Sequence, residues 1–328
     1  MGEFDLIARY FTRPTPRAVL GVGDDCALLQ PAPGTQLAIS SDMLVEGRHF
    51  FADVDPGALG HKALAVNLSD LAACGARPLA FTLALALPRV DERWLAGFSG
   101  GLLALADAHG CELVGGDTTQ GPLNICITVF GEVPVVGGQG RALLRAGARA
   151  GDDVYVSGTL GDARLALDAL RGRIALPAGL LAQARARLER PTPRVALGQA
   201  LRGVATAALD VSDGLLGDLG HLLGKSRVGA TLDTSLAIEL LASRAHPAWA
   251  ARLFSLKMQL ECVLAGGDDY ELAFTAPASA RDAVQAAARQ AATPVTRIGR
   301  IDAAPGLRLV DGQGRPVAGR YASFDHFA

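Results

Sequence analysis

Residues 55–75, Asp-Pro-Gly-Ala-Leu-Gly-His-Lys-Ala-Leu-Ala-Val-Asn-Leu-Ser-Asp-Leu-Ala-Ala-Cys-Gly, carry the pattern of one complete α-helix. The pair Asp55-Pro56 provides an N-cap followed by proline at the first helical position. Apolar residues then recur at helical spacing, and Gly75 is a suitable stop. Short apolar stretches, Gln36–Ser40 before this helix and Leu79–Leu87 after it, are typical of strands. The order strand, helix, strand predicts an α/β fold.

Strands and helices continue to alternate through the rest of the chain. Between Val135 and Arg149 the periodicity lapses into glycine, arginine and alanine, which predicts a domain boundary. We therefore expect two α/β domains, residues 1–136 and residues 137–328. The further predicted strands are Glu112–Val114, Asn124–Phe130, Val154–Ser157, Ala205–Leu209, Glu271–Thr275 and Val295–Ile298, the further helices include Asp91–His109, Ser212–Leu223 and Ala278–Ala292, and a hairpin is predicted over Gly306–Val317.

Composition limits the classes of function. The chain has 328 residues, a formal net charge of -2 and 50% hydrophobic residues. A near-neutral charge argues against a general nucleic-acid surface, because such surfaces carry basic patches. No apolar segment is long enough to cross a bilayer, and the first residues do not form a signal peptide. The five scattered cysteines form no CxxC pair, so we expect reduced thiols in a cytoplasmic protein that binds neither nucleic acid nor membrane.

Aspartates beside glycine or serine recur where predicted strands end or helices begin. Magnesium takes oxygen ligands, typically one or two carboxylates together with phosphates and water. Loops at strand ends can converge at one edge of a sheet, and helix starts supply N–H groups for anions. The stretches are Gly23-Asp24-Asp25, Ser40-Ser41-Asp42, Gly115-Gly116-Asp117, Asp210-Val211-Ser212-Asp213-Gly214 and Gly266-Gly267-Asp268-Asp269, with Asp70 inside the helix over residues 55–75.

Each loop taken alone is better explained as an ordinary turn or N-cap, because aspartate and glycine favour such positions. Gly151-Asp152-Asp153 is expected to be a structural turn of that kind. Asp70 differs, since an aspartate beside Leu68 and Leu71 in an apolar helix needs either a role or a surface position. If the aspartates converge, they would repel one another without bound cations, so the set as a whole predicts a metal and phosphate site.

A larger set of motifs, spread over nearly the whole chain, carries a family resemblance. The stretches are Gly2–Ala8, Gly21–Ala27, Ser41–Gly47 with His49-Phe50, Lys62–Ala73, Gly115–Thr119, Arg145–Ala148, Asp210–Leu215, Gly267–Leu272 and Phe324–Phe327. In this order they resemble the thiamine-monophosphate kinase family, which belongs to the superfamily of aminoimidazole ribonucleotide synthetase and selenophosphate synthetase. Each motif alone is moderately specific, whereas the ordered set is highly specific.

The resemblance implies two α/β domains of the aminoimidazole ribonucleotide synthetase type, with the N-terminal sheets paired in a homodimer. It implies that ATP phosphorylates thiamine monophosphate to thiamine diphosphate, with several Mg²⁺ ions bound. The implied metal ligands are Asp25, Ser40, Ser41, Asp42, Asp70, Asp117, Asp210 and Asp213. The implied ATP contacts are Gly116, Asp117, Arg145 and Ser212, and the implied contacts to thiamine monophosphate are His49, Asp268 and Phe324. The choice between Asp24 and Asp25 stays open.

The chemistry of the acceptor fits this resemblance. A phosphate monoester has a second pKa near about 6, so at pH 7 it is mostly a nucleophilic dianion and needs no protein base. We therefore expect direct in-line transfer without a catalytic acid or base. The thiazolium ring carries a fixed positive charge, which an aromatic side chain such as Phe324 and a carboxylate such as Asp268 would stabilise.

Three kinds of alternative follow from the same sequence. Selenophosphate synthetase, which the aspartates also resemble, uses an N-terminal cysteine or selenocysteine with lysine, and here no cysteine precedes Cys26 and no lysine precedes Lys62. A non-catalytic nucleotide or thiamine-phosphate binding protein would not turn over ATP. A metal-dependent phosphatase would release inorganic phosphate from thiamine monophosphate without ATP.

Overall fold

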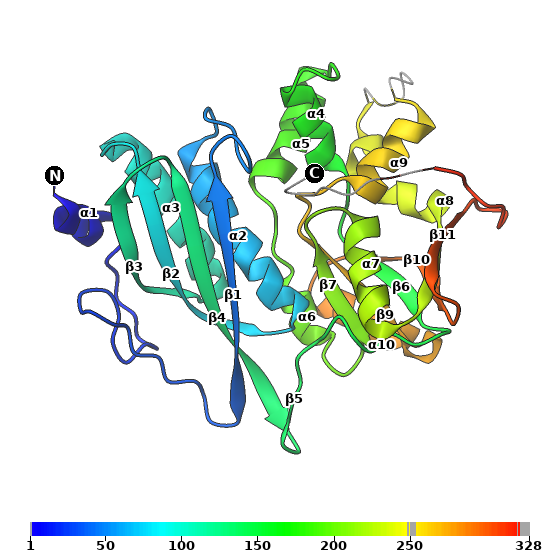
Figure 1. The fold of residues 1–328 in the computed structure, drawn as a ribbon, viewed down its shortest axis with the longest axis horizontal. Coiled ribbons are helices and arrows are strands. Elements are labelled where there is room, and N and C mark those ends of the chain that lie inside the picture. Colours follow the sequence, from blue (N-terminus) through cyan, green and yellow to red (C-terminus); the bar gives the residue numbers. More distant parts are fainter. Residues whose placement is uncertain (1, 248, 250–253, 320, 322–328) are drawn as a thin grey trace. The chain divides into compact units, whose positions relative to one another are not determined.

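The computed structural model describes residues 2–247, 249, 254–319 and 321. Figure 1 shows the order of the elements along the chain. The chain forms two units, and each is described by itself. The N-terminal unit comprises Met1–Leu71 and Ala76–Ala142, and the C-terminal unit comprises Ala72–Gly75 and Leu143–Ala328.

A sheet of mixed direction forms the centre of the N-terminal unit. Its strands lie in the order β1-β4-β2-β3, with the short β5 paired to β4. Strand β4 is antiparallel to both β1 and β2, and β2 is parallel to β3. The strands are β1 (Thr35–Val45), β2 (Arg77–Leu87), β3 (Glu112–Gln120), β4 (Asn124–Val136) and β5 (Gln139–Gly140).

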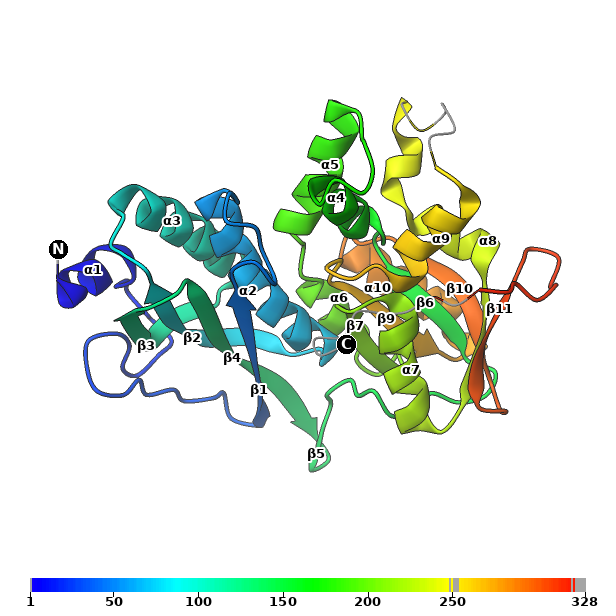
Figure 2. The same ribbon diagram turned by 45° about the horizontal axis from the view of Figure 1, so that its top comes forward.

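Two helices, α2 (Pro56–Ala73) and α3 (Glu92–His109), cover one face of this sheet, as Figure 2 shows. They touch through glycines: a Cβ on Gly60 would lie 2.0 Å from the carbonyl oxygen of Phe98, and one on Gly101 would lie 1.9 Å from that of Gly57. Helix α3 begins and ends as predicted. The Asp91 side chain accepts hydrogen bonds at its start, and Gly110 adopts left-handed φ at its end. The short α1 (Glu3–Tyr10) packs beside α3 and β3.

The opposite face of the sheet is only partly covered. Along β1 the side chains alternate, and Leu37, Ile39 and Met43 are 44%, 61% and 53% exposed. The segment before β1 covers another part of this face, where Ala27 and Leu29 pack against a small core cluster. The N-terminal sheet therefore has a helix-covered face and an open face.

The C-terminal unit is built on a second mixed sheet, in the order β11-β8-β10-β6-β9-β7. Only the β11–β8 pair is parallel. The strands are β6 (Asp153–Ser157), β7 (Ala207–Val211), β8 (Gly229–Asp233), β9 (Glu271–Ala276), β10 (Val295–Asp302) and β11 (Gly306–Val310). The helices are α4 (Asp162–Leu170), α5 (Ala178–Glu189), α6 (Val195–Ala200), α7 (Leu215–Ser226), α8 (Thr234–Ala237), α9 (Leu256–Ala265) and α10 (Arg281–Gln290), with short 3-10 turns at Ile238–Leu240, Ala242–Ala245 and Ala278–Ala280.

The helices around this sheet share one apolar core with it. Leu165 of α4, Leu180 of α5 and Leu219 of α7 are fully buried in the cluster that contains Val154 and Ile298 from the strands. The alternating α/β pattern predicted from the sequence is therefore confirmed in both units.

Several predicted strand ends are wrong. Strand β1 continues through Ser40, Ser41 and Asp42 to Val45, and β3 continues through Gly115–Thr119, so these aspartates lie within strands rather than in loops. The ladder to β4 extends β1, and the ladder to β2 extends β3, despite the low strand propensity of glycine and aspartate. The predicted hairpin over Gly306–Val317 is confirmed in short form: Val310 and Pro316 make an antiparallel bridge, and the N–H of Val317 donates to the carbonyl of Leu309. Its first strand, β11, also pairs with β8.

Candidate active site

Three of the predicted metal-binding residues lie together where β1 passes α2. The Ser40 hydroxyl donates to Oδ2 of Asp70, 2.5 Å away. The backbone N–H of Asp42 donates to Oδ1 of Asn67, 3.1 Å away, and the Asn67 amide in turn donates to the carbonyl of Ala63. Ser40 and Asp42 are two residues apart on a strand, so both point to the helix-covered face. This group, Ser40, Asp42, Asn67 and Asp70, offers only oxygen-bearing side chains of the kind that Mg²⁺ prefers.

Ser41 and Asp117 lie on the open face of the same sheet. The Ser41 hydroxyl is 3.0 Å from Oγ1 of Thr128, and it also donates to the carbonyl of Ile127. Four residues lie side by side across the sheet, one on each neighbouring strand. They are Asp117 on β3, Ala84 on β2, Cys126 on β4 and Met43 on β1. Because paired residues point to the same face, Asp117 is on the side of Met43 and not on that of Asp70. Within one chain the structure therefore does not bring all six N-terminal candidates together.

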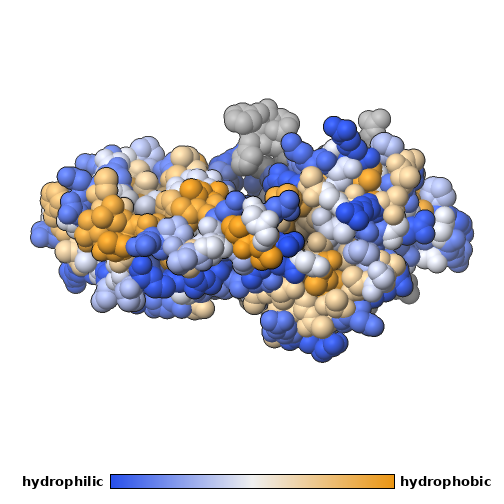
Figure 3. All heavy atoms as spheres, turned by 90° about the horizontal axis from the view of Figure 1, so that it is seen from below, coloured by the Kyte–Doolittle hydropathy of each residue, from blue (hydrophilic) through white to orange (hydrophobic). Residues whose placement is uncertain are grey.

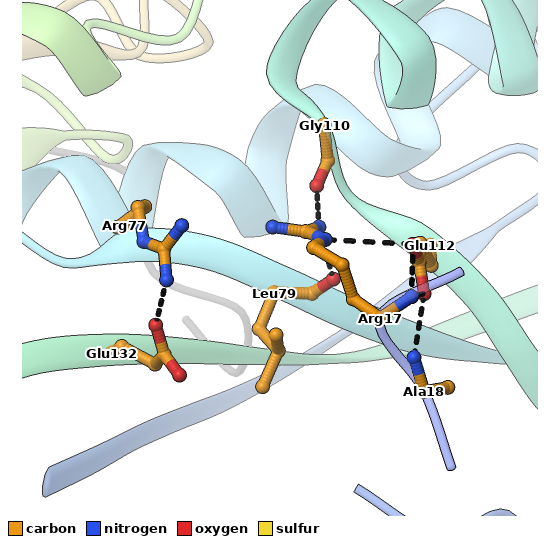
Figure 4. Close-up of polar contacts among 7 residues, drawn as sticks. All are labelled: Arg17, Ala18, Arg77, Leu79, Gly110, Glu112 and Glu132. Carbon is orange, nitrogen blue, oxygen red and sulfur yellow. Dashed lines mark hydrogen bonds and ion pairs between the residues drawn. The ribbon is translucent and has the colours of Figure 1, made fainter. Parts of the chain in front are cut away.

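Asp25 belongs to a segment that is attached to the open face at two places, and Figure 4 shows the first of them, at Glu112. Glu112 accepts hydrogen bonds from the backbone N–H groups of Arg17 and Ala18, while the Arg17 guanidinium donates to the carbonyls of Leu79 and Gly110. Further along, Glu132 accepts from the N–H of Ala32 at 2.7 Å and from the side chain of Arg77.

Between these two attachments the chain forms a hairpin-like loop. Leu20 and Leu28 exchange backbone hydrogen bonds at its base, and Asp24 and Asp25 are exposed at its tip. The Asp24 carboxylate accepts from the N–H of Asp25 at 2.8 Å, so Asp24 stabilises the turn itself.

His49, a predicted contact to the acceptor, has a defined ring orientation. The backbone N–H of Val45 donates to its Nδ1, 2.9 Å away, so in the neutral ring Nε2 carries the proton. Lys62 of α2 is only 3% exposed and donates to the carbonyl of His49 at 3.5 Å. Lys62 and Asn67 both lie in the motif that carries the resemblance, but sequence reasoning gave them no role. Their signal was a lysine and an asparagine inside an otherwise apolar helix.

In the C-terminal unit, Asp210 is the next-to-last residue of β7, and the loop Ser212–Gly214 leads into α7. Asp218, in the first turn of α7, is 8% exposed, and its Oδ2 accepts from the N–H groups of Ser212 (3.0 Å), Asp213 (3.0 Å) and Gly214 (3.1 Å). Burial raises the pKa of Asp218 to about 6, against the effect of these hydrogen bonds. Sequence reasoning gave Asp218 no role, and these three backbone N–H groups are already engaged by it.

The loop before β9, which carries Asp268, is joined to the loop after β7. The N–H of Asp268 donates to the carbonyl of Ser212 at 2.8 Å, and that of Tyr270 donates to the carbonyl of Val211 at 2.9 Å. Asp268 and Tyr270 have left-handed φ values of 65° and 53°, a conformation that costs free energy in residues other than glycine. A backbone held in this way at a predicted substrate contact is typical of a functional loop.

Two acidic residues at the end of this loop, Asp269 and Glu271, are buried. Glu271 is fully buried and accepts from Arg194 (2.6 Å), Arg187 (2.9 Å) and the hydroxyl of Ser157 (2.6 Å). Asp269 accepts from the N–H of Gly161 at 2.8 Å through one oxygen, while its other oxygen is buried and has no hydrogen-bond partner among the described residues. Burial raises the pKa of Asp269 well above its ordinary value.

The remaining predicted residues are placed as follows. Gly116 approaches β2 so closely that a Cβ would lie 1.8 Å from the carbonyl oxygen of Leu83, so only glycine fits. Arg145 is exposed in the segment between the two sheets, and its carbonyl accepts from the hydroxyl of Ser226. Phe324 lies outside the described residues.

Two features are absent from the described part of the chain. Over residues 2–247, 249, 254–319 and 321, no group of three or more histidine, cysteine, aspartate or glutamate side chains is arranged to hold a metal ion. In that same part of the chain, no helix is long and apolar enough to cross a bilayer. The N-terminal group is compatible with Mg²⁺ nonetheless, since this ion is commonly held by one or two carboxylates and completed by phosphates and water.

Comparison with known proteins defines first the class and then the family. The model of the AIR synthase related protein family matches residues 23–133 with its N-terminal domain and residues 149–312 with its C-terminal domain. The thiamine-monophosphate kinase of Salmonella typhimurium is 46% identical to this chain, covering 100% of this chain and 98% of the relative. The chain therefore belongs to the thiamine-monophosphate kinase family of AIR synthase related proteins.

Solved structures agree with this assignment. The crystal structure of thiamine-monophosphate kinase from Stenotrophomonas maltophilia K279a is 44% identical, with a TM-score of 0.82 and 96% of each chain covered. A structure described as AaThiL complexed with AMPPCP and TMP is 28% identical, with a TM-score of 0.75, covering 91% of this chain and 89% of that chain.

Proposed function

We propose that this chain transfers the γ-phosphate of ATP to thiamine monophosphate, giving ADP and thiamine diphosphate. Membership of the family supports the reaction, as does the similar structure described as binding both AMPPCP and TMP. The observation in this structure that carries the proposal is the oxygen-bearing group formed by Ser40, Asp42 and Asp70 where β1 meets α2. A phosphoryl transfer between two anions requires such a place for Mg²⁺.

Magnesium, when bound, would neutralise charge between the two phosphates and favour an in-line approach. Asp42 and Asp70 of the N-terminal unit, and Asp210 and Asp213 of the C-terminal unit, are its proposed principal ligands. Asp70 is already oriented by the Ser40 hydroxyl, and the backbone of Asp42 is held by Asn67. Ser40 completes this set on the helix-covered face, and Asp25, Ser41 and Asp117 are further proposed ligands on the open face.

The proposed nucleotide contacts are Gly116, Asp117, Arg145 and Ser212. At Ser212 the backbone N–H is engaged by Asp218 and the carbonyl by the N–H of Asp268, which leaves the side-chain hydroxyl for the nucleotide. At Gly116 the absence of a side chain is required by the adjacent strand. Arg145 would contribute a positive charge toward the phosphates.

The proposed acceptor contacts are His49, Asp268 and Phe324. The Nε2–H of His49 is suited to donate to a phosphate oxygen, because Nδ1 is occupied by the N–H of Val45. Asp268 would face the fixed positive charge of the thiazolium, and Phe324 would stack on its ring. No residue is proposed as a catalytic acid or base, since the acceptor phosphate is already mostly a dianion at pH 7.

We also propose a homodimer formed through the open face of the N-terminal sheet. Leu37, Ile39 and Met43 expose apolar surface there, and such patches often mark protein interfaces. In Figure 3 apolar side chains gather over the N-terminal unit, on the left. Light scattering of Ile39→Glu should give half the mass of the wild type. Leu256→Glu, at an equally exposed leucine of α9, is the control and should leave the mass unchanged.

We propose that the protein is cytoplasmic, because of the state of its cysteines. All five are free thiols, and Cys111 and Cys262 are buried. Thiols in such settings persist in a reducing compartment.

The reaction is tested by comparing acceptors. With ATP and Mg²⁺, ADP release should depend on thiamine monophosphate and be poor with unphosphorylated thiamine. Release of inorganic phosphate from thiamine monophosphate without ATP would indicate a phosphatase instead. Tight nucleotide binding with no ADP release under any of these conditions would indicate a binding protein.

A further inference from the structure

The loop after β7 has an unusual internal support. One oxygen of Asp218 accepts three consecutive backbone N–H groups, those of Ser212, Asp213 and Gly214, all at 3.0 to 3.1 Å. Gly214 is the N-cap of α7, and Ser212 and Asp213 precede it, so two of the three donors belong to the loop and one to the helix start. Asp218 therefore holds the loop before the helix through its backbone.

Fixing these three N–H groups also fixes the carbonyls on the same stretch of backbone. The carbonyls of Val211 and Ser212 accept from Tyr270 and Asp268, the two residues of the next loop that have left-handed φ. The loop before β9 is thus attached to a backbone whose orientation Asp218 determines.

The two loops are in close backbone contact at glycines, where a larger side chain would not fit. A Cβ on Gly267 would lie 2.4 Å from the carbonyl oxygen of Ser212, and one on Gly214 would lie 2.9 Å from the backbone of Ala265. Because the loops are packed backbone to backbone, a shift in one displaces the other.

We propose that Asp218 is a positioning residue that holds the proposed metal-binding loop and the proposed acceptor-binding loop as one rigid piece. This rests on the proposed function of Asp210, Asp213 and Asp268. Asp218 touches neither substrate in this proposal. It acts through the backbone of Val211–Gly214, so its loss affects metal binding and acceptor binding together.

The test uses Asp218→Asn, which keeps the shape of the side chain and replaces a charged acceptor by a neutral one. We expect the Mn²⁺ concentration at half-saturation to rise about tenfold, as measured by electron paramagnetic resonance with AMPPCP present. The KM for thiamine monophosphate should also rise about tenfold. At saturating metal and acceptor, kcat should stay within about threefold of the wild type, since no reacting group is removed.

Asp233→Asn is the matched control, because Asp233 also caps a helix of the C-terminal unit, α8, through the N–H of Ser235. It should lower thermal stability without changing either constant. If Asp218→Asn does not fold, Gly267→Ala tests the same contact between the two loops. It should raise both the Mn²⁺ concentration at half-saturation and the KM for thiamine monophosphate.

Two results would overturn the proposal: unchanged constants in Asp218→Asn, or a fall in kcat alone. Failure of the proposed function would look different, because the wild type would then make no thiamine diphosphate. The Mn²⁺ titration requires no turnover and would still report on Asp218.

Discussion

Two Gly-Asp-Asp triplets, residues 151–153 and 267–269, each precede a strand of the C-terminal sheet, and these strands, β6 and β9, are paired side by side. In the first triplet every carboxylate has partners. Asp152 accepts from the N–H of Arg149 and the hydroxyl of Thr206, while Asp153 accepts from Arg281 and Arg297. The second has left-handed backbone at Asp268 and a buried, unpartnered oxygen at Asp269. The same tripeptide is thus used once for stability and once at a strained loop.

The pKa values separate the two triplets in the same way. Hydrogen bonds from Arg281 lower the pKa of Asp153 below its ordinary value of 3.8. Burial raises that of Asp269 well above it. The two triplets therefore differ in the protonation behaviour of their carboxyl groups as well as in backbone geometry, which provides experiments on matched pairs.

The largest effect on catalysis is expected for a residue of β7. This strand pairs with β9 on the side away from β6. Asp210→Asn should lower kcat by about 100-fold or more, because a carboxylate that would hold Mg²⁺ beside the transferring phosphate is removed. Asp152→Asn, in the structural triplet, should keep kcat near that of the wild type. Steady-state rates at saturating ATP, Mg²⁺ and acceptor make the comparison. Equal losses in the two variants would mean that Asp210 acts through stability alone.

A smaller effect is expected within the second triplet. Asp268→Asn should raise the KM for thiamine monophosphate by about 2- to 30-fold, the range of a charge contact to a ring cation at a partly exposed site. The KM for ATP should not change, and Asp152→Asn should change neither constant. An equal rise for both substrates would place Asp268 outside the acceptor site.

The first triplet should show its effect in stability. Asp153 is 1% exposed and receives hydrogen bonds from two arginines, so Asp153→Asn should lower the free energy of unfolding at pH 7 by about 1 to 3 kcal/mol. Since the folded pKa lies below 3.8, wild-type stability from this group is present above pH 3.8 and is lost as the pH falls further. The difference between the two proteins, measured by urea denaturation, should therefore shrink below that pH. A difference that does not depend on pH would contradict the ion-pair account.

For Asp269 the dependence of stability on pH should have the opposite sign. Its folded pKa is raised, so the folded protein holds the proton more tightly and wild-type stability falls as the pH rises above 3.8. Asp269→Asn removes this cost and should be more stable than the wild type at pH 8 by roughly 1 kcal/mol, with no gain near pH 4. The facing charges are Arg187, Asp162 and Glu271. Destabilisation at pH 8 would show that attraction to Arg187 outweighs burial.

The sequence predicted many of the regular elements, although not β8 or α9, and the residues explain the successes. Helix α2 has a proline in its first turn and a glycine after its end, and α3 has the Asp91 cap and the Gly110 stop, all of which act locally. The extent of β1 and β3 could not be predicted in this way. Hydrogen bonds to distant strands hold Ser41 and Gly116 in the ladders, and no local signal records them.

The candidate site was predictable as a set of residue types and not as an arrangement. Alternation along β1 places Ser41 opposite Ser40 and Asp42, but this follows only once the strand is known to continue that far. Asp218 looked like an ordinary acidic residue in the first turn of a helix. Its three backbone contacts depend on the path of the loop before it, which sequence patterns do not specify.

The central claim is that the γ-phosphate of ATP is transferred to an acceptor that already carries a phosphate. The most direct measurement is mass spectrometry of the products after incubation with Mg²⁺, thiamine monophosphate and ATP labelled with ¹⁸O in the γ-phosphate. The account predicts that the label appears in thiamine diphosphate, with unlabelled ADP formed in equal amount. Label found in free inorganic phosphate, with thiamine monophosphate unchanged or converted to thiamine, would contradict it.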